Sequence, residues 1–594
     1  MDGTMNRGGL MLTGRALVAV PKDDFKVFLT WRYLSQDAPE TRFEVYRSSG
    51  KSESSNQHKL VEVVEESTNC IDDPGKGKFS YYVKPVGGGL EGVQSNVFHV
   101  ETLAKGRDWV EILPAMKGKH LQFSDRHFAD TDGDGELEFI TYSPQVPSYR
   151  GGAVKQSFKI QVFRLLDDDE PKWSFDTGMG TQTIPFKEGD RRMDWDYEWT
   201  FKPVAWDIDG DGKAEIITLA KIEDKYQYVI IKDAGEDYEI MYQFDSPVPV
   251  GVDDEVRSGN NNRHFPFFAR LHPDKCSFVL QGGTYTHWEM WAWTWNAGKQ
   301  KLELSWYIDS EDDDFEGNHS SAHTILVMDM DGDGLDEICN GATIINNDGT
   351  ILWSANEVFG ENCHIDGLVI DDIDPNNPGL EIMMNEEKRM FVFPSGFSNV
   401  YALFDLKTGR VIWQKEAPGI HLQLNVVADI TGNKGLDIIG TYGGHKPVGG
   451  YACTFDGKDI PYPFQEFPIN GDRIWAMDWD GKNGHQVCLN FTKIYGKGGK
   501  LLKEITFNNA PEGEIIPWNE HYLYMHWCNV DIIGDHRENL LVQMKDGCIR
   551  AFLNNEPIGF RKPCKWQNHA YQMMQAPGDY RYYAAVLHRN KNDA

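Results

Sequence analysis

Aspartates at alternate positions, with glycines between them, recur in loops along the chain. Three loops carry acids at the first, third, fifth and ninth positions, and their predicted ligands are Asp130, Asp132, Asp134 and Glu138; Asp207, Asp209, Asp211 and Glu215; and Asp329, Asp331, Asp333 and Glu337. Carboxylates at this spacing form an oxygen cage for a hard cation such as Ca²⁺. An EF-hand is excluded, because its closing glutamate stands at the twelfth loop position between two helices. We therefore predict calcium as the cofactor, mainly joining each loop to the strand that follows it.

Four further loops are incomplete copies of this pattern. They begin at Asp372, Asp429, Asp478 and Asp531, and the first of them adds Asp372, Asp374 and Glu381 to the predicted calcium ligands. Weak calcium sites fill only where calcium is plentiful, as it is outside cells. The first twenty residues show no clean signal-peptide core, because Arg7 and Arg15 interrupt short apolar pieces. We expect a secreted or periplasmic protein whose leader is absent or removed, and a cytoplasmic location stays open.

The spacing of the loops predicts the architecture. They start at positions 130, 207, 329, 372, 429, 478 and 531, so that successive starts lie 77, 122, 43, 57, 49 and 53 residues apart. Most intervals fit one four-stranded blade, and the interval of 122 residues has room for two. Inside it, segments 267–271 and 277–280 have the pattern of a blade without an acidic loop. We predict an all-β protein with an eight-bladed β-propeller over residues 105–594.

Residues 10–101 have a different pattern. Segments 27–31 and 43–46 alternate apolar and polar residues as half-buried strands do, and glycine-rich turns such as 87–89 separate them. Short strands without a helical period over about 90 residues are typical of a β-sandwich of the fibronectin type III kind. We predict such a sandwich in front of the propeller.

Composition excludes several classes of protein. The chain has 91 acidic and 59 basic residues, and the resulting net charge of −32 repels a polyanion, so nucleic acid is not an expected partner. No stretch approaches the roughly 18 consecutive apolar residues of a membrane span. The nine cysteines are scattered without metal-type spacing, which argues against zinc. We expect a monomer that does not bind a membrane.

Several segments resemble the rhamnogalacturonan lyases of polysaccharide lyase family 11. They are Gly14–Val20, Gly317–His319 with the Asp329 loop, His364–Asp366 leading into Asp372–Pro375, Asp531–Glu538, and Trp566–Tyr571, and they keep the family order over nearly the whole chain. The resemblance implies a calcium-dependent enzyme that cleaves the rhamnose–galacturonate backbone of pectin by β-elimination. That chemistry needs a cation or an Arg/Lys to neutralise the uronate carboxylate, a base for the C5 proton, and an acid for the leaving oxygen.

The resemblance also implies site residues. Tyr571 falls on a tyrosine that contacts substrate and is the first candidate for a catalytic residue. His323 and His364 fall on histidines near the propeller centre and could act in catalysis as bases or as metal ligands. Arg263 matches an arginine that could neutralise a carboxylate, while Tyr285 and Arg537 are further candidate substrate contacts. Each of these residues could equally have a purely structural place.

One segment departs from the family pattern. The family carries an Asn-Gly-Thr-Lys stretch before the Asp531 motif, whereas residues 519–526 here contain no lysine. Histidine and tyrosine serve base and acid roles in β-elimination, so we predict that His521 and Tyr524 replace the lysine in catalysis and that Tyr522 binds substrate.

The leading hypothesis is a calcium-dependent lyase acting on an acidic, rhamnose-containing polysaccharide of the rhamnogalacturonan I type. A non-catalytic carbohydrate-binding propeller is the alternative that the missing lysine favours, and a lyase for another uronate polymer such as ulvan is a third. The tryptophan-rich segment 288–295 fits either sugar stacking or blade core.

Overall fold

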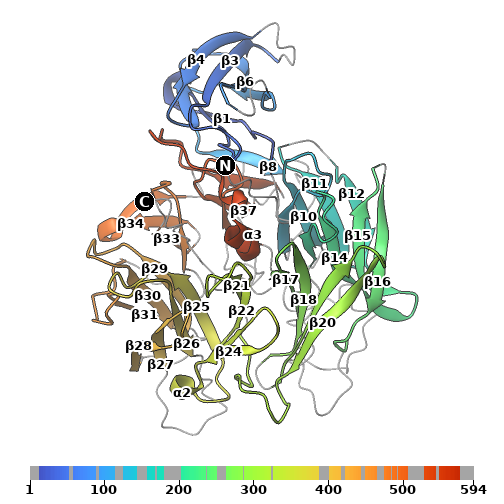
Figure 1. Ribbon diagram of the computed structural model, residues 1–594. Coiled ribbons are helices and arrows are strands. Elements are labelled where there is room, and N and C mark those ends of the chain that lie inside the picture. Colours follow the sequence, from blue (N-terminus) through green and yellow to red (C-terminus); the bar gives the residue numbers. More distant parts are fainter. Residues whose placement is uncertain are drawn as a thin grey trace.

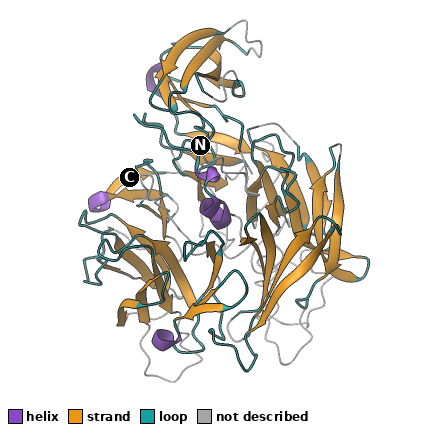
Figure 2. Ribbon diagram, in the orientation of Figure 1, coloured by secondary structure: helices purple, strands orange, loops and turns teal. Residues whose placement is uncertain are grey.

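The protein consists almost entirely of antiparallel strands, with only short helices (Figure 2). The computed structural model describes residues 12–51, 58–88, 93–113, 125–143, 157–166, 170–179, 203–235, 237–250, 263–284, 287–322, 325–386, 400–416, 422–442, 449–464, 474–482, 485–490, 492–505, 528–543 and 548–575. Among these residues, no helix is long and apolar enough to cross a membrane. The prediction of an all-β chain is confirmed.

Two sheets, which we call the N-terminal sheets, come first in the chain (Figure 1). One contains β1 (Val18–Pro21), β2 (Val27–Thr30) and β5 (Asn69–Asp72), and the other contains β3 (Arg42–Ser49), β4 (Lys59–Val64), β6 (Lys78–Val86) and β7 (Phe98–Glu101). A short 3-10 helix, η1 (Asp23–Phe25), joins β1 to β2. Both sheets contribute to one core, in which Trp31, Phe43 and Tyr81 are fully buried.

Seven sheets of four strands and one of three follow in the described part of the chain. The first four contain β9 (Asp125–Ala129), β10 (Glu138–Ser143), β11 (Lys159–Arg164) and β12 (Trp173–Asp176); β13 (Val204–Trp206), β14 (Glu215–Ile222), β15 (Lys225–Asp233) and β16 (Tyr238–Asp245); β17 (His264–His272), β18 (Lys275–Gly282), β19 (Glu289–Asn296) and β20 (Lys301–Asp309); and β21 (Ile325–Met328), β22 (Glu337–Asn340), β23 (Thr343–Ile345) and β24 (Ile351–Ser354). In each of them, strands that follow one another in the chain are paired antiparallel.

The remaining sheets continue this order. They contain β25 (Ile365–Asp371), β26 (Glu381–Glu386), β27 (Val400–Asp405) and β28 (Val411–Glu416); β29 (Leu422–Ala428), β30 (Asp437–Tyr442) and β31 (Gly450–Cys453); β32 (Ile474–Met477), β33 (Gln486–Leu489), β34 (Lys493–Gly496) and β35 (Lys500–Glu504); and β36 (Cys528–Val530), β37 (Asn539–Gln543), β38 (Ile549–Phe552) and β8 (Trp109–Leu113). The described helices among them are α2 (Asn356–Phe359), η4 (Lys497–Gly499), η6 (Lys565–Gln567) and α3 (His569–Gln575).

The last sheet combines one strand from the first fifth of the chain with three strands from near its end. Strand β8 directly follows the N-terminal sheets, yet it pairs with β38, with Ala551 opposite Val110 and Phe552 opposite Trp109. The first strands of neighbouring sheets also contact one another. Contacts join β9 to β13, β13 to β17 and β17 to β21, and likewise β25 to β29 and β29 to β32. Helix α3 lies among the sheets (Figure 1), and three of their cores include its residues Tyr571, Met573 and Met574.

Tryptophans on outer strands join neighbouring sheets by a repeated contact. Each indole lies over a glycine in a turn of the next sheet, in the pairs Trp306–Gly349, Trp353–Gly409 and Trp413–Gly457. The indole N–H groups donate to carbonyls of the same turns, those of Asn347, Leu406 and Phe455, at 2.9, 2.9 and 2.8 Å. The three glycines have φ of 87°, 68° and 76°, a left-handed conformation that other residues adopt only with strain. These contacts give part of the tryptophan content a purely structural purpose.

Candidate active site and metal loops

The complete acidic loops follow the first strands of their sheets and lead into the second strands. In the first loop, the carboxylate of Asp130 accepts hydrogen bonds from the amides of Gly133 at 2.7 Å and Gly135 at 2.8 Å. The same two bonds recur at Asp207 and at Asp329. Gly133 and Gly135 have φ of 77° and 83°, so glycine is needed to turn the amides toward the aspartate. The first aspartate therefore organises its loop.

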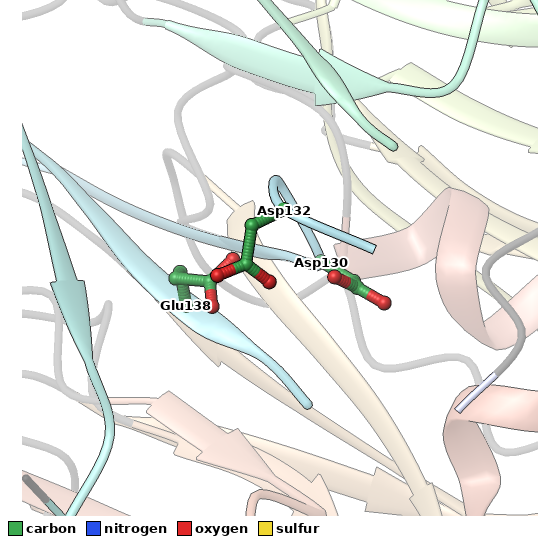
Figure 3. Close-up of side chains that lie close together, drawn as sticks. All are labelled: Asp130, Asp132 and Glu138. Carbon is green, nitrogen blue, oxygen red and sulfur yellow. The ribbon is translucent and has the colours of Figure 1, made fainter. Parts of the chain in front are cut away.

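Three groups of carboxylates in these loops have the geometry of metal ligands. In each group the ligand atoms lie within 4.8 Å of one another, and the members are Asp130, Asp132 and Glu138 (Figure 3); Asp207, Asp209 and Glu215; and Asp329, Asp331 and Asp333. Moreover, Oε1 of Glu215 and Oε1 of Glu337 are fully buried and have no hydrogen-bond partner. A buried carboxylate oxygen without a partner is costly unless a cation contacts it. The three loops thus fit a hard cation, while Asp134 and Asp211 stay predicted ligands.

Burial shifts the titration of these carboxylates in the same direction. It raises the pKa of Asp130 and of Asp207 to about 6, although loop amides oppose the shift. It raises the pKa of Glu138 to about 8, of Glu215 to about 9 and of Glu337 to about 7. The ionised forms of Glu138 and Glu215 are therefore unfavourable at neutral pH until a cation is close.

Basic side chains distinguish the three loops. Lys172 lies 2.6 Å from Oδ2 of Asp132, and Lys232 lies 2.9 Å and 2.6 Å from Oδ2 of Asp209 and Asp211. In the described part of the chain, no lysine or arginine forms an ion pair with the three aspartates of the Asp329 loop. Lys407 donates to the backbone carbonyl of Asp331, so the carboxylates of this loop, unlike those of the other two, have no lysine among the described residues paired with them.

The incomplete loops are held differently. The two oxygens of Glu381 accept hydrogen bonds, Oε2 from the amides of Ile373 and Asp374 and Oε1 from the side chain of Asn377 at 2.7 Å. The calcium ligands predicted at Asp372, Asp374 and Glu381 stay predictions, because no group of potential metal ligands among the described residues contains them.

A lysine joins the last two acidic loops. The ammonium of Lys565 lies 3.0 Å from Oδ2 of Asp478, which is fully buried, and its backbone amide donates to Oδ2 of Asp531 at 2.9 Å. The chain thus supplies its own cation where the complete loops present carboxylates to a metal ion.

A cluster of buried polar groups lies at the opposite ends of the first strands, where these strands begin. His364 directly precedes β25, and its Nδ1 lies 2.6 Å from the carbonyl oxygen of Ser321. Its Nε2 lies 2.9 Å from Oδ1 of Asp366, which is 1 % exposed. Asp366 lies where the register of β25 shifts between Ile365 and Gly367, and this irregularity places its carboxylate against the imidazole ring.

Hydrogen bonds extend this cluster to Arg263, which directly precedes β17. The hydroxyl of Ser321 donates to Oγ1 of Thr284 at 3.1 Å and accepts from Nε2 of Gln281 at 3.0 Å. One residue before Thr284, the amide of Gly283 donates to the carbonyl of Arg263 at 2.9 Å. These bonds lead from His364 to the backbone of Arg263, and both predicted site residues are buried. Both ring nitrogens of His364 face acceptor oxygens, so the imidazole can take a proton only when Nε2 turns away from Asp366. A guanidinium can neutralise a carboxylate.

Two predicted site residues lie elsewhere, at the Asp531 loop. Tyr571 is buried against Trp566, and its hydroxyl oxygen accepts a hydrogen bond from the amide of Asp531 at 2.8 Å. Burial raises the pKa of Tyr571 well above its usual value. Arg537 is 1 % exposed and donates from Nη2 to Asp535 at 2.5 Å. In these positions both side chains stabilise the loop, and their predicted roles toward substrate stay predictions.

The other predicted site residues, His323, Tyr285, His521, Tyr522 and Tyr524, lie outside the described residues. Sequence reasoning missed Asp366 as a site residue. The His-x-Asp spacing of the motif at residues 364–366 was the available signal.

An all-β scaffold with metal-type loops and an oriented histidine is compatible with a carbohydrate-active enzyme, and comparisons with known proteins define its family. Residues 256–576, more than half of the chain, match the model of the rhamnogalacturonan lyase family 11 C-terminal domain, and residues 12–101 match that of the rhamnogalacturonan I lyase beta-sheet domain. The protein belongs to rhamnogalacturonan lyase family 11 and is a polysaccharide lyase.

Relatives are similar over most of their length. Rhamnogalacturonan exolyase YesX of Bacillus subtilis is 26% identical over 94% of this chain and 93% of its own, and rhamnogalacturonan endolyase YesW of the same organism is 24% identical over 94% and 88%. Among solved structures, YesX has a TM-score of 0.71 at 20% identity, covering 98% of this chain and 96% of its own. A rhamnogalacturonan lyase of Bacillus licheniformis has a TM-score of 0.70 at 22% identity, covering 96% and 94%. These structural similarities concern the fold.

Proposed function

We propose that the protein cleaves a rhamnogalacturonan I-type backbone by calcium-dependent β-elimination at a uronate. The observation that carries this proposal is the buried pair of His364 and Asp366, linked through Ser321 to Arg263. Family membership and the names of the relatives, which are rhamnogalacturonan lyases, support the substrate class.

The residues of this cluster suit the steps of the reaction. The guanidinium of Arg263 neutralises the uronate carboxylate, which makes the C5 proton easier to remove. His364 accepts that proton at Nε2 once this nitrogen has turned away from Asp366, because its Nδ1 is occupied by the Ser321 carbonyl. The leaving C4 oxygen needs a proton donor, for which His521 and Tyr524 remain the candidates from the sequence. Calcium, when bound, would supply positive charge and stabilise the acidic loops.

The same proposal includes the architecture. The eight consecutive sheets, the contacts between their first strands and the pairing of β8 with β38 support an eight-bladed propeller over residues 105–594. The two N-terminal sheets support a separate sandwich of the fibronectin type III kind over residues 10–101. Calcium loops of this type favour a protein that works outside the cytoplasm.

The test is the ultraviolet absorbance of unsaturated uronate products on rhamnogalacturonan I, ulvan and polygalacturonate, with calcium and with a chelator. We expect a calcium-dependent rise on rhamnogalacturonan I. A rise on ulvan alone would reassign the substrate. No rise on any polymer, with folded protein, would overturn the lyase proposal and favour a carbohydrate-binding protein.

A further inference from the structure

The third of the eight sheets differs from its neighbours in the connection between its first two strands. A short turn around Pro273 and Asp274 joins β17 to β18, in place of an acidic loop. The sheet also contains the tryptophan-rich segment 288–295, which divides into two parts. Trp288 and Trp295 are 0 % and 3 % exposed and belong to the core, whereas Trp291 is half-buried.

The strand register relates the outer part of this sheet to the candidate active site. His264, next to Arg263, lies opposite Gly282, Gly282 lies opposite Glu289, and Glu289 lies opposite Asp309. With strands about 4.8 Å apart, Asp309 is about 14 Å from the first strand at the same end of the sheet. A short run of sugar units extending outward from the Arg263 cluster spans this distance.

Near this end, two aromatic side chains form a cross-strand pair. Trp291 lies opposite Tyr307, with ring centroids 5.3 Å apart and an interplanar angle of 35°. Tyr307 is 44 % exposed, and its hydroxyl donates to Oε1 of Glu289 at 2.5 Å, which fixes the ring. Trp293, stacked 6.4 Å from Trp291, supports the pair from the core side. An exposed, fixed aromatic ring is a suitable surface for the apolar face of a pyranose.

The polar groups around the pair indicate which sugar it accepts. Glu289 and Asp309 flank Tyr307, and Asp309 also lies 2.8 Å from Nε2 of His287. Their carboxylate oxygens can accept hydrogen bonds from sugar hydroxyls, but their negative charge repels a uronate. The site therefore favours a neutral sugar.

We propose that Trp291, Tyr307, Glu289 and Asp309 form an outer subsite for a neutral sugar unit of the polysaccharide chain. The inference rests on the proposed function, because it takes the polysaccharide to extend outward from the cluster of His364 and Arg263. It adds a place where a long substrate gains affinity without contact to the reacting atoms.

The experiment compares the purified full-length protein with its variants Tyr307→Ala and Tyr307→Phe. Leu501→Ala is the matched control, because Leu501 is similarly exposed, at 42 %, on β35 of another sheet.

Lyase rates are measured on rhamnogalacturonan I polymer and on its shortest cleaved oligosaccharide, and binding is measured by retardation in gels that contain the polymer. Tyr307→Ala is expected to raise KM on the polymer about five- to tenfold with unchanged kcat, as loss of an aromatic contact implies. Tyr307→Phe keeps the ring but loses its bond to Glu289, so its KM should lie between those of the wild type and Tyr307→Ala. The control should match the wild type, and the short substrate should show no change.

Failure of the subsite and failure of the proposed function give different results. If no polymer is cleaved but Tyr307→Ala abolishes retardation in the gel, the subsite stands while the lyase proposal fails. Unchanged KM and retardation in Tyr307→Ala and in Trp291→Ala would overturn the subsite. A change of molecular mass in size-exclusion chromatography, caused by Tyr307→Ala, would overturn it in favour of a contact between copies of the chain.

Discussion

Nη1 of Arg32, in the N-terminal segment, lies 2.5 Å from Oε2 of Glu136, in the first acidic loop. The arginine side chain is 2 % exposed, and the same nitrogen donates to the carbonyl of Gly14 at 3.2 Å. The backbone amides of Thr13 and Gly14 in turn donate to the carbonyl of Gly135 at 3.2 and 3.1 Å. The first acidic loop is therefore held from outside by residues that precede and follow β1 and β2.

The N-terminal sheets also contact the last acidic loop. Oγ1 of Thr30 donates to Oδ2 of Asp535 at 2.9 Å, and Asp535 also binds Arg537, whose guanidinium lies over Phe28. The first and last of the eight sheets are thus both attached to the N-terminal sheets. This attachment adds to the closure made by the pairing of β8 with β38.

Glu136→Gln should lower the free energy of unfolding by about 1–3 kcal/mol, because it leaves the buried guanidinium of Arg32 without its charged partner. Urea unfolding measures the change. Glu101→Gln is the control, since its pair with Lys78 is 3.4 Å long and mostly exposed, and it should cost no more than about 1 kcal/mol. Equal effects of the two variants would show that the Arg32–Glu136 contact contributes nothing specific.

Local sequence patterns predicted much of this fold. The Asp130 loop ends at Glu138, where β10 begins, and the Asp207 loop ends at Glu215, where β14 begins. These boundaries follow from glycine conformation, carboxylate spacing and strand alternation, all of which act within about ten residues.

Contacts between distant segments were not predictable in this way. Arg537 belongs to a motif that suggested substrate contact, but its guanidinium lies over Phe28, which belongs to the N-terminal sheets. Tyr571 likewise contacts the Asp531 loop because α3 packs among three cores. Such positions depend on tertiary packing, which one sequence does not reveal. His364 and Asp366 were an intermediate case, because their spacing is local but their link to Arg263 is not.

Asp331→Asn should reduce the stabilisation of the protein by calcium. The Asp329 loop has no competing ion pair among the described residues, so loss of one ligand should weaken its site directly. Native mass spectrometry at limiting calcium should find one ion fewer than in the wild type, and the calcium-induced rise in Tm should shrink. Glu357→Gln, an equal charge change on the exposed side of α2, should leave both unchanged. An unchanged ion count in Asp331→Asn would contradict the assignment.

Calcium binding near pH 7 should release protons. Burial raises the pKa of Glu138 to about 8 and of Glu215 to about 9, so these groups hold protons in the metal-free protein. A carboxyl with a raised folded-state pKa stabilises the fold at low pH and loses that contribution as the pH rises from about 4.5 toward 8 or 9. Calorimetry in buffers of different ionisation enthalpy measures the release, and the Tm in chelator should fall from pH 5 to 8. Glu138→Gln should make both effects smaller, and identical proton release in that variant would refute the role of Glu138.

Lys565→Met should destabilise the protein whether or not calcium is present. Lys565 is the cation that faces the fully buried Asp478, and its removal leaves that carboxylate without its closest opposite charge. The expected loss is about 3–5 kcal/mol, as for other buried ion pairs that lose one partner. Lys458→Met is the control, because its pair with Asp456 is exposed on the lysine side. If Lys565→Met and Lys458→Met had the same free energy of unfolding, and only added calcium changed it, the loop would not depend on Lys565.

His364→Gln should lower kcat on rhamnogalacturonan I roughly 10²–10⁴-fold, the range expected for loss of a general base. Glutamine preserves the hydrogen-bonding capacity toward the Ser321 carbonyl or Asp366, so Tm should change little. Asp366→Asn should lower kcat as well, by leaving the imidazole without the carboxylate that orients it. His272→Gln is the matched control, because His272 ends the same strand that Arg263 precedes and its Nε2 contacts Thr294, far along β17 from the cluster. Full activity of His364→Gln would exclude the imidazole as the base and leave His521 as the residue to test next.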